Sequence, residues 1–249
     1  MVQSFLLVRS ADRSLGSSSS FRVVLPQAYS KVTSISLLSC EMPYSMYNVD
    51  VPYLQGVNFV HNSVTYVFTL QAGYYTIEDL QAYMLAALQS AFPSAGVTSV
   101  NYSKTSGRIY LVYTSGLAFS VQANGNGALG RLLGTDPSGI ATLSAGGVLA
   151  MPCVATLAPS STVLMRIAEV PAQMVATNGQ HAFARLQLSG APGSIVMANA
   201  AASVFNSYAY ATPVAALSSL TVSLFTQDGV ALDLHGCEYT FTLLKTSSS

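Results

Sequence analysis

Alternating apolar and polar positions are the dominant pattern of this chain, and they are clearest between Leu217 and Lys245. Two runs of alternate apolar residues stand out there: Leu220, Val222 and Leu224, then Cys237, Tyr239, Phe241 and Leu243. A period of two places each run on one face of a β-strand. The residues between the runs, Gln227-Asp228-Gly229, favour a turn. The stretch therefore predicts a β-hairpin against which the rest of the chain packs.

Further short strands are predicted along most of the chain. They cover residues 21–25, 32–42, 57–60, 64–70, 97–102, 108–113, 117–121, 162–170, 182–188, 195–197 and 204–208. In residues 32–42 apolar side chains fall on both faces, which predicts a strand that lies between two layers. Many short strands with closely spaced turns indicate a sandwich or a jelly roll, so we expect an all-β, antiparallel protein.

The spacing of apolar residues changes to three and four after Thr76. The apolar positions are Ile77, Leu80, Met84, Ala87, Leu88 and Ala91. Thr76 stands at the N-cap and Asp79 at the capping-box position, while Pro93 ends the pattern. These residues predict the one long helix of the chain, within a helix-bearing excursion at about residues 71–135.

The N-terminal segment lacks a clear period. Residues 1–20 end in Gly16 and four serines, and we expect them to form an extended arm that reaches a neighbouring molecule. The remaining residues, 21–249, then form a single domain, since a chain of 249 residues is ample for one large all-β core.

Charged residues make up only 8% of the chain, against about 25% in an average soluble domain. Protein interfaces are depleted of charge at their centres, so covered surfaces are one explanation. A compositional bias towards Ala, Ser and Val is the other. Ten basic residues balance ten acidic ones and neither kind forms a block, which argues against direct nucleic-acid binding. No apolar run approaches the ~20 residues of a membrane span, and Phe5 to Val8 is too short for a signal peptide.

Candidate chemistry is sparse. Cys40, Cys153 and Cys237 lack the spacing of disulfide or zinc frameworks, and we expect free thiols in a reducing compartment. A GxGxxG match at residues 125–130 has no parallel strand-helix context for a dinucleotide. Asp233 and His235, with Glu238 close by, are candidate metal ligands. A role as turn residues is the simpler interpretation.

His61 and His181 have no acidic neighbour in sequence, and no nucleophile elbow is present. The sequence therefore predicts no catalytic residue, no cofactor and no metal site, and indicates that the protein is not an enzyme. Fourteen tyrosines remain to be explained. Their clusters suit interfaces, sugar-binding grooves or packing near a sheet edge, and include Tyr44/Tyr47/Tyr53, Tyr74/Tyr75 and Tyr208/Tyr210.

Four sets of residues, in a consistent order along the chain, resemble a known family. They are RSADR (9–13) with FRVVLP (21–26); ISLLSCEMPYSMYNV (35–49); GYYTIEDL (73–80) with SGRI (106–109) and LGRLLG (129–134); and LFTQDG (224–229) with DLHGCEYTFTL (233–243). The family comprises the penton and related single-jelly-roll minor capsid proteins of virophages, polinton-like viruses and nucleocytoplasmic large DNA viruses. The resemblance implies a single eight-stranded jelly roll and no catalytic residues.

From this resemblance we expect a structural capsid protein that forms homo-pentamers at the five-fold vertices of an icosahedral virion and is assembled inside the infected host cell. Its expected partners are neighbouring major and minor capsid proteins. One alternative is another minor component of the shell. A second is a module whose tyrosine-bearing loops bind a host-surface glycan, and an enzyme is a third.

Overall fold

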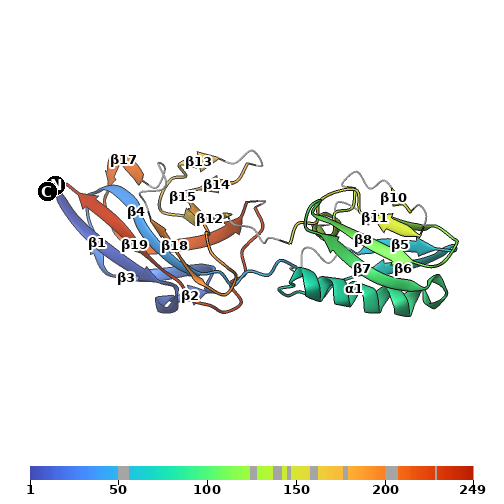
Figure 1. Ribbon diagram of the computed structural model, residues 1–249. Helices are drawn as coiled ribbons and strands as arrows, with labels where there is room; N and C mark the ends of the chain where they lie inside the picture. Colours follow the sequence, from blue (N-terminus) through green and yellow to red (C-terminus); the bar gives the residue numbers. More distant parts are fainter. Residues whose placement is uncertain are drawn as a thin grey trace. The chain divides into compact units, whose positions relative to one another are not determined.

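The computed structural model of the protein describes residues 1–49, 56–123, 128–136, 142–144, 147–157, 162–175, 179–199, 207–227 and 229–248 (Figure 1). The chain divides into two compact units. The first comprises Met1–Met46 and Ser160–Ser249, and the second comprises Tyr47–Pro159. The second unit is therefore an insertion into the first, and it begins before and ends after the expected excursion at 71–135.

The first unit is built from two antiparallel sheets. One has the strand order β1 (Val2–Arg9), β19 (Thr240–Ser247), β4 (Val32–Pro43) and β16 (Ile195–Asn199), with β17 (Ser207–Val214) also paired to β4. The other has the order β15 (Ala184–Gln187), β12 (Thr162–Ile167), β18 (Leu217–Thr226), β3 (Ser20–Tyr29) and β2 (Leu15–Gly16). Most connections cross from one sheet to the other, while β2 and β3, β12 and β15, and β16 and β17 stay in one sheet, and the whole has the topology of a jelly roll.

This arrangement confirms the expected all-β class, the antiparallel jelly roll and the helix-containing insertion. β16 and β17 lie along different parts of β4, opposite residues 39–43 and 32–36, so together they occupy one place in the sheet. The short strands β13 (Met174–Val175) and β14 (His181–Ala182) pair with each other.

The core of the first unit fills the space between its two sheets. Phe21 on β3 lies edge-on to Tyr239, with ring centroids 5.9 Å apart. Tyr239 stacks in turn on Phe241 of β19, at 6.0 Å. Both predicted runs of alternate apolar residues contribute side chains to this core, among them Leu220, Val222, Leu224, Tyr239, Phe241 and Leu243.

The predicted hairpin between Leu217 and Lys245 is wrong in its pairing. β18 pairs with β3 and β12, whereas β19 pairs with β1 and β4 in the opposite sheet. A period of two specifies which side chains are buried but not which strand supplies the hydrogen bonds. The segment between them therefore crosses from one sheet to the other.

The prediction that both faces of residues 32–42 are buried between two layers is also wrong. The register of β4 with β19 shifts between Thr242 and Leu243, which lie opposite Ser39 and Leu37. Such a β-bulge reverses the alternation of side chains beyond it. Ile35 and Cys40 therefore enter the same core, although their positions in the sequence have opposite parity.

Residues 2–9 of the expected N-terminal arm form a strand of the sheet. β1 pairs with β19 in an unbroken register from Val2 opposite Ser247 to Arg9 opposite Thr240. Val8 is buried in the core, and Leu6 packs against it. The polar residues that follow β1 obscured this strand, because they end its pattern early and leave only a short apolar run in the sequence.

Glu238, just before β19, forms hydrogen bonds with residues 10 and 13 of the segment that follows β1. Ser10 donates a hydrogen bond to one carboxylate oxygen of Glu238, and Arg13 Nη1 lies 2.6 Å from the other. Ser10 Oγ also accepts a hydrogen bond of 2.9 Å from the backbone N–H of Tyr239. The hydrogen bond from Ser10, and then that from Arg13, lower the pKa of Glu238.

We expect Glu238→Gln to remove a pH-dependent part of the stability. Because its pKa is lowered by folding, the ionised Glu238 stabilises the folded state above its ordinary pKa of 4.5, and this contribution is lost as the pH falls through the folded pKa. The stability difference between wild type and variant should therefore shrink on acidification, as measured by chemical unfolding from neutral pH to below 4.5. Glu78→Gln, at an exposed carboxylate of the second unit, is the matched control. A difference that stays constant over this range would contradict the assignment.

The second unit packs one helix against short antiparallel sheets (Figure 1). The sheets are β10 (Thr142–Leu143), β9 (Phe119–Ala123), β5 (Val57–His61) and β6 (Val64–Phe68), and β11 (Val148–Ala150), β8 (Arg108–Tyr113) and β7 (Val97–Ser103). The helices are α1 (Ile77–Ala91), α2 (Ala128–Leu133) and the short η3 (Pro93–Ala95). The predicted β5–β6 hairpin is confirmed.

Helix α1 begins and ends as its sequence predicts. Thr76 Oγ1 accepts a hydrogen bond of 3.1 Å from the N–H of Asp79, and the Asp79 carboxylate accepts one of 3.2 Å from the N–H of Thr76. This reciprocal capping box satisfies two N–H groups that lack helical partners. Leu80, Met84 and Leu88 are the fully buried side chains of α1 and belong to the core of the second unit.

Candidate functional site

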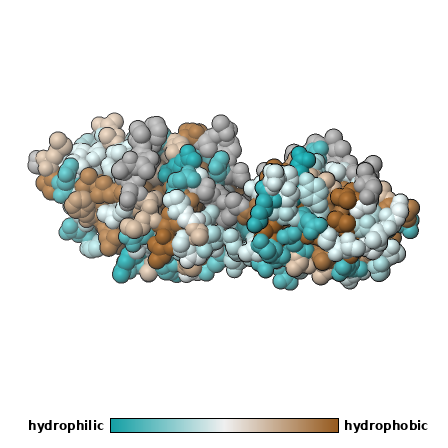
Figure 2. Space-filling view, viewed as in Figure 1, coloured by the Kyte–Doolittle hydropathy of each residue, from teal (hydrophilic) through white to brown (hydrophobic). Residues whose placement is uncertain are grey.

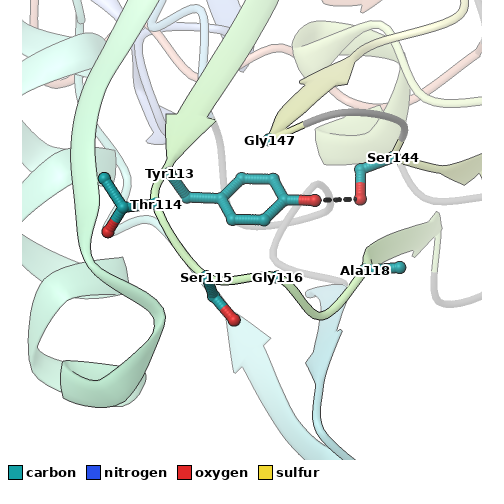
Figure 3. A pocket seen from close by; sticks show the side chains of 7 residues that line it. All are labelled: Tyr113, Thr114, Ser115, Gly116, Ala118, Ser144 and Gly147. Atoms are coloured by element: carbon teal, nitrogen blue, oxygen red, sulfur yellow. Dashed lines mark hydrogen bonds between the residues drawn. The ribbon is translucent and has the colours of Figure 1, made fainter.

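A hollow of about 500 Å³ opens in the second unit (Figure 3). It is lined by Tyr113, Thr114, Ser115, Gly116, Ala118, Ser144 and Gly147. The Tyr113 hydroxyl lies 2.5 Å from Ser144 Oγ, which also accepts a hydrogen bond of 2.7 Å from the N–H of Phe119. These polar groups bond to one another and hold the end of β8 beside the start of β9.

His61 is buried beside Ser115, one of the residues that line this hollow. It is 3% exposed, and its Nε2 is 3.0 Å from Ser115 Oγ. Its ring lies 4.6 Å from that of Phe119 and 6.0 Å from that of Phe92. No ion pair joins His61 to a carboxylate in the described part of the chain. His61 therefore has the surroundings of a packed core residue.

Asp233, His235 and Glu238 do not converge. Asp233 Oδ1 accepts a hydrogen bond of 2.7 Å from the backbone N–H of His235, and Asp233 Oδ2 is 3.6 Å from His235 Nδ1. Glu238 instead bonds to Ser10 and Arg13. His235 and Gly236 both have positive φ, of 51° and 78°, as expected for turn residues. Over the described ranges, no three His, Cys, Asp or Glu side chains group together as metal ligands would.

The other residues singled out in the sequence are dispersed. His181 is exposed on β14. The glycines at 125 and 127 of the GxGxxG match lie outside the described residues, and the α2 helix that follows has six residues. The three cysteines are free thiols. Burial in the first core raises the pKa of Cys40 to about 12, with a further contribution from Glu41, which opposes thiolate formation.

Most tyrosines pack within their own units. The rings of Tyr208 and Tyr210 on β17 are 4.8 Å apart and edge-on. The Tyr210 hydroxyl donates a hydrogen bond of 3.0 Å to the backbone oxygen of Glu169, and burial raises the pKa of Tyr210 to about 12. Tyr44 is buried in the first core, whereas Tyr74 is 47% exposed. Tyr53 lies outside the described residues.

Large apolar side chains at the surface are more informative than any cleft, and the sequence did not single them out. Hydrophobic residues are visible at the surface of both units (Figure 2). In the first unit, Phe5 and Leu7 on β1 are 72% and 64% exposed, and Ile195 and Met197 on β16 are 74% and 61% exposed. These pairs lie on opposite edges of one sheet. Exposed apolar patches of this kind mark surfaces that contact other molecules.

Among the comparisons with known proteins, the structural one finds a likeness, and that likeness concerns the fold. No protein-family model matches the sequence, and no curated protein sequence matches it. The chain is similar to the crystal structure of the selenomethionine-labelled mavirus penton protein, with a TM-score of 0.54 and 10% identity. The match covers 99% of this chain and 100% of that chain. Both units therefore take part in the likeness.

In the described part of the chain, none of the helices has the length and apolar character needed to cross a membrane.

Proposed function

We propose that this protein is a structural component of a viral capsid, and that it forms pentamers at the five-fold vertices of an icosahedral virion. The observation that carries the proposal is the likeness in fold to a penton protein over the whole length of both chains. The exposed apolar residues of β1 and β16 and the 8% charge content support it, because such surfaces suit contacts with neighbouring subunits.

Its action is mechanical. The jelly roll is a rigid block held by two hydrogen-bonded sheets, and its surfaces provide contacts to further copies and to the neighbouring major and minor capsid proteins. Assembly would take place in the infected host cell, and the assembled protein would reside in the virion.

The purified protein is expected to assemble into pentamers as its concentration rises. A ring with five-fold symmetry repeats one heterologous interface, and the exposed apolar residues supply surface to bury in it. Native mass spectrometry and sedimentation velocity measure the stoichiometry, and cryo-electron microscopy of the virion tests the vertex position. A chain traced at another position in the shell would replace the penton assignment with that of a different minor capsid protein. A chain absent from the shell would contradict the capsid role.

The alternative function is binding of a host-surface glycan. The hollow beside Tyr113 favours it, because hydroxyl groups of Tyr, Ser and Thr line it. Binding of the full chain to a glycan array, lost in Ser115→Ala and Thr114→Ala, would support this function. It is compatible with a vertex position, which faces outward.

A further inference from the structure

The outer face of one jelly-roll sheet carries three exposed arginines, which we name the arginine face. Arg22 lies on β3, Arg166 on β12 and Arg185 on β15. Across the sheet, Arg166 is opposite Ser223, which is opposite Ser20, so these polar residues share one face. The residues that alternate with them, such as Met165 and Ile167, enter the core.

No ion pair neutralises the arginine face within the described residues. Arg22 donates to Ser219 Oγ at 3.1 Å, and Arg185 donates to Gln187 Oε1 at 3.3 Å; both acceptors are neutral. No described carboxylate lies within ion-pair distance of any of the three arginines. Glu169 bonds to the N–H and hydroxyl of Thr221, at 2.8 and 2.9 Å, and Thr221 is the cross-strand neighbour of Arg22.

The outer face of the other sheet has the opposite character, and we name it the glutamate face. Glu41 on β4 lies opposite Met197 of β16 and Thr240 of β19, and it has no hydrogen bond or ion pair with a described residue. Arg9 lies opposite Thr240 on the same face, but Asp12 neutralises it at 2.7 Å. Glu41 is therefore the uncompensated charge of this face.

Exposed apolar side chains lie at both edges of this face, on β16 beside Glu41 and on β1 beyond β19. Phe5 and Leu7 have the same parity as Arg9 along β1 and so project from the same face. Met197 is the direct cross-strand neighbour of Glu41, and Ile195 follows it at the same parity. The glutamate face thus combines one free carboxylate with four exposed apolar residues, whereas the arginine face combines three arginines with the exposed Leu15 and Val24.

We propose that the glutamate face of one copy of this chain docks on the arginine face of the next copy. The inference rests on the proposed function and identifies the partner of that surface. Charge complementarity selects this pairing, because two arginine faces would oppose like charges. The pairing is heterologous, which is the kind of interface that a ring requires. The apolar residues around Glu41 supply the area removed from water, and Glu41 sets the register through an arginine.

A charge exchange tests this contact in the full chain. Glu41→Arg and Arg166→Glu are each expected to weaken assembly at least about tenfold, since each opposes like charges across the interface. The double variant E41R/R166E restores opposite charges and is expected to recover most of the assembly. Arg108→Glu, an exposed arginine on β8 of the second unit, is the matched control for a general change in net charge. Sedimentation velocity at low and high salt measures assembly, and thermal unfolding checks that each variant is folded.

The outcomes separate the contact from the pentamer. Recovery in the double variant supports the contact. Single variants that assemble like wild type overturn the contact and leave the pentamer intact, and a double variant weaker than both single variants also overturns the contact. An assembly that responds to the charge exchange but contains another number of copies keeps the contact and overturns the pentamer. A wild-type chain that stays monomeric at every concentration overturns both.

Discussion

Phe241→Ala is expected to lower the free energy of unfolding of the first unit by about 3–5 kcal/mol. Phe241 is 1% exposed on β19, and its ring stacks on that of Tyr239 in the centre of the jelly roll. Alanine would leave a cavity between two sheets whose backbones are fixed by hydrogen bonds on both sides, so the surrounding side chains have little freedom to fill it. Urea unfolding followed by circular dichroism measures the change.

Phe5→Ala is the matched control for this substitution. Phe5 lies on β1, opposite the neighbouring β19 residue Leu244, but it is 72% exposed and outside the core. We expect its stability effect to stay within about 0.5 kcal/mol, as at most surface positions. If the glutamate face docks as proposed, Phe5→Ala instead weakens assembly. Equal losses of stability in the two variants would contradict the placement of Phe241 in the core or that of Phe5 at the surface.

Deletion of residues 1–9 is expected to destabilise the first unit by more than about 3 kcal/mol, or to prevent its folding. The deletion removes the whole of β1, which exposes the hydrogen-bonding edge of β19 and takes Val8 out of the core. Burial of one such side chain contributes about 1.5–3 kcal/mol, and the strand also supplies Leu6 and its backbone hydrogen bonds. Thermal unfolding and expression of folded protein measure the effect.

Leu7→Ser distinguishes the contribution of the β1 backbone and core side chains from that of an exposed side chain on the same strand. Leu7 lies on the exposed side of β1, so serine preserves the backbone pairing and leaves the core unchanged. Its expected effect on stability is within about 0.5 kcal/mol. An unstructured arm would make the deletion as mild as this substitution, and that result would show that β1 is dispensable.

Local features of the fold were predictable from neighbouring residues. The Thr76–Asp79 capping box, the three-four spacing after it and Pro93 define α1, because a helix makes its hydrogen bonds within one segment. The β5–β6 hairpin was predictable for a similar reason, since only His61, Asn62 and Ser63 separate the two apolar runs, and Asn62 and Ser63 both adopt positive φ.

Pairing between distant strands was not predictable in this way. β19 pairs with β1 and β4, which lie far from it in the sequence. Nothing in the residues of β19 indicates that these strands, and not the preceding β18, are its partners. The bulge opposite Leu37 and Ser39 changed the face assigned to Cys40, because one extra residue reverses the parity of everything beyond it. The arginine and glutamate faces are likewise invisible in sequence, since their members come from separate strands.

The sequence by itself determined the strand-rich class, the helix with its cap and the core-facing side of strands without a bulge, such as the apolar run of β18. These properties depend on periodicity and on contacts within a few residues. Only the tertiary structure decided that β1 completes a sheet, that β18 and β19 belong to opposite layers and that the uncompensated charges gather on two outer faces. Those properties depend on backbone hydrogen bonds between segments far apart in the chain, which every strand can offer and which side-chain pattern alone does not assign.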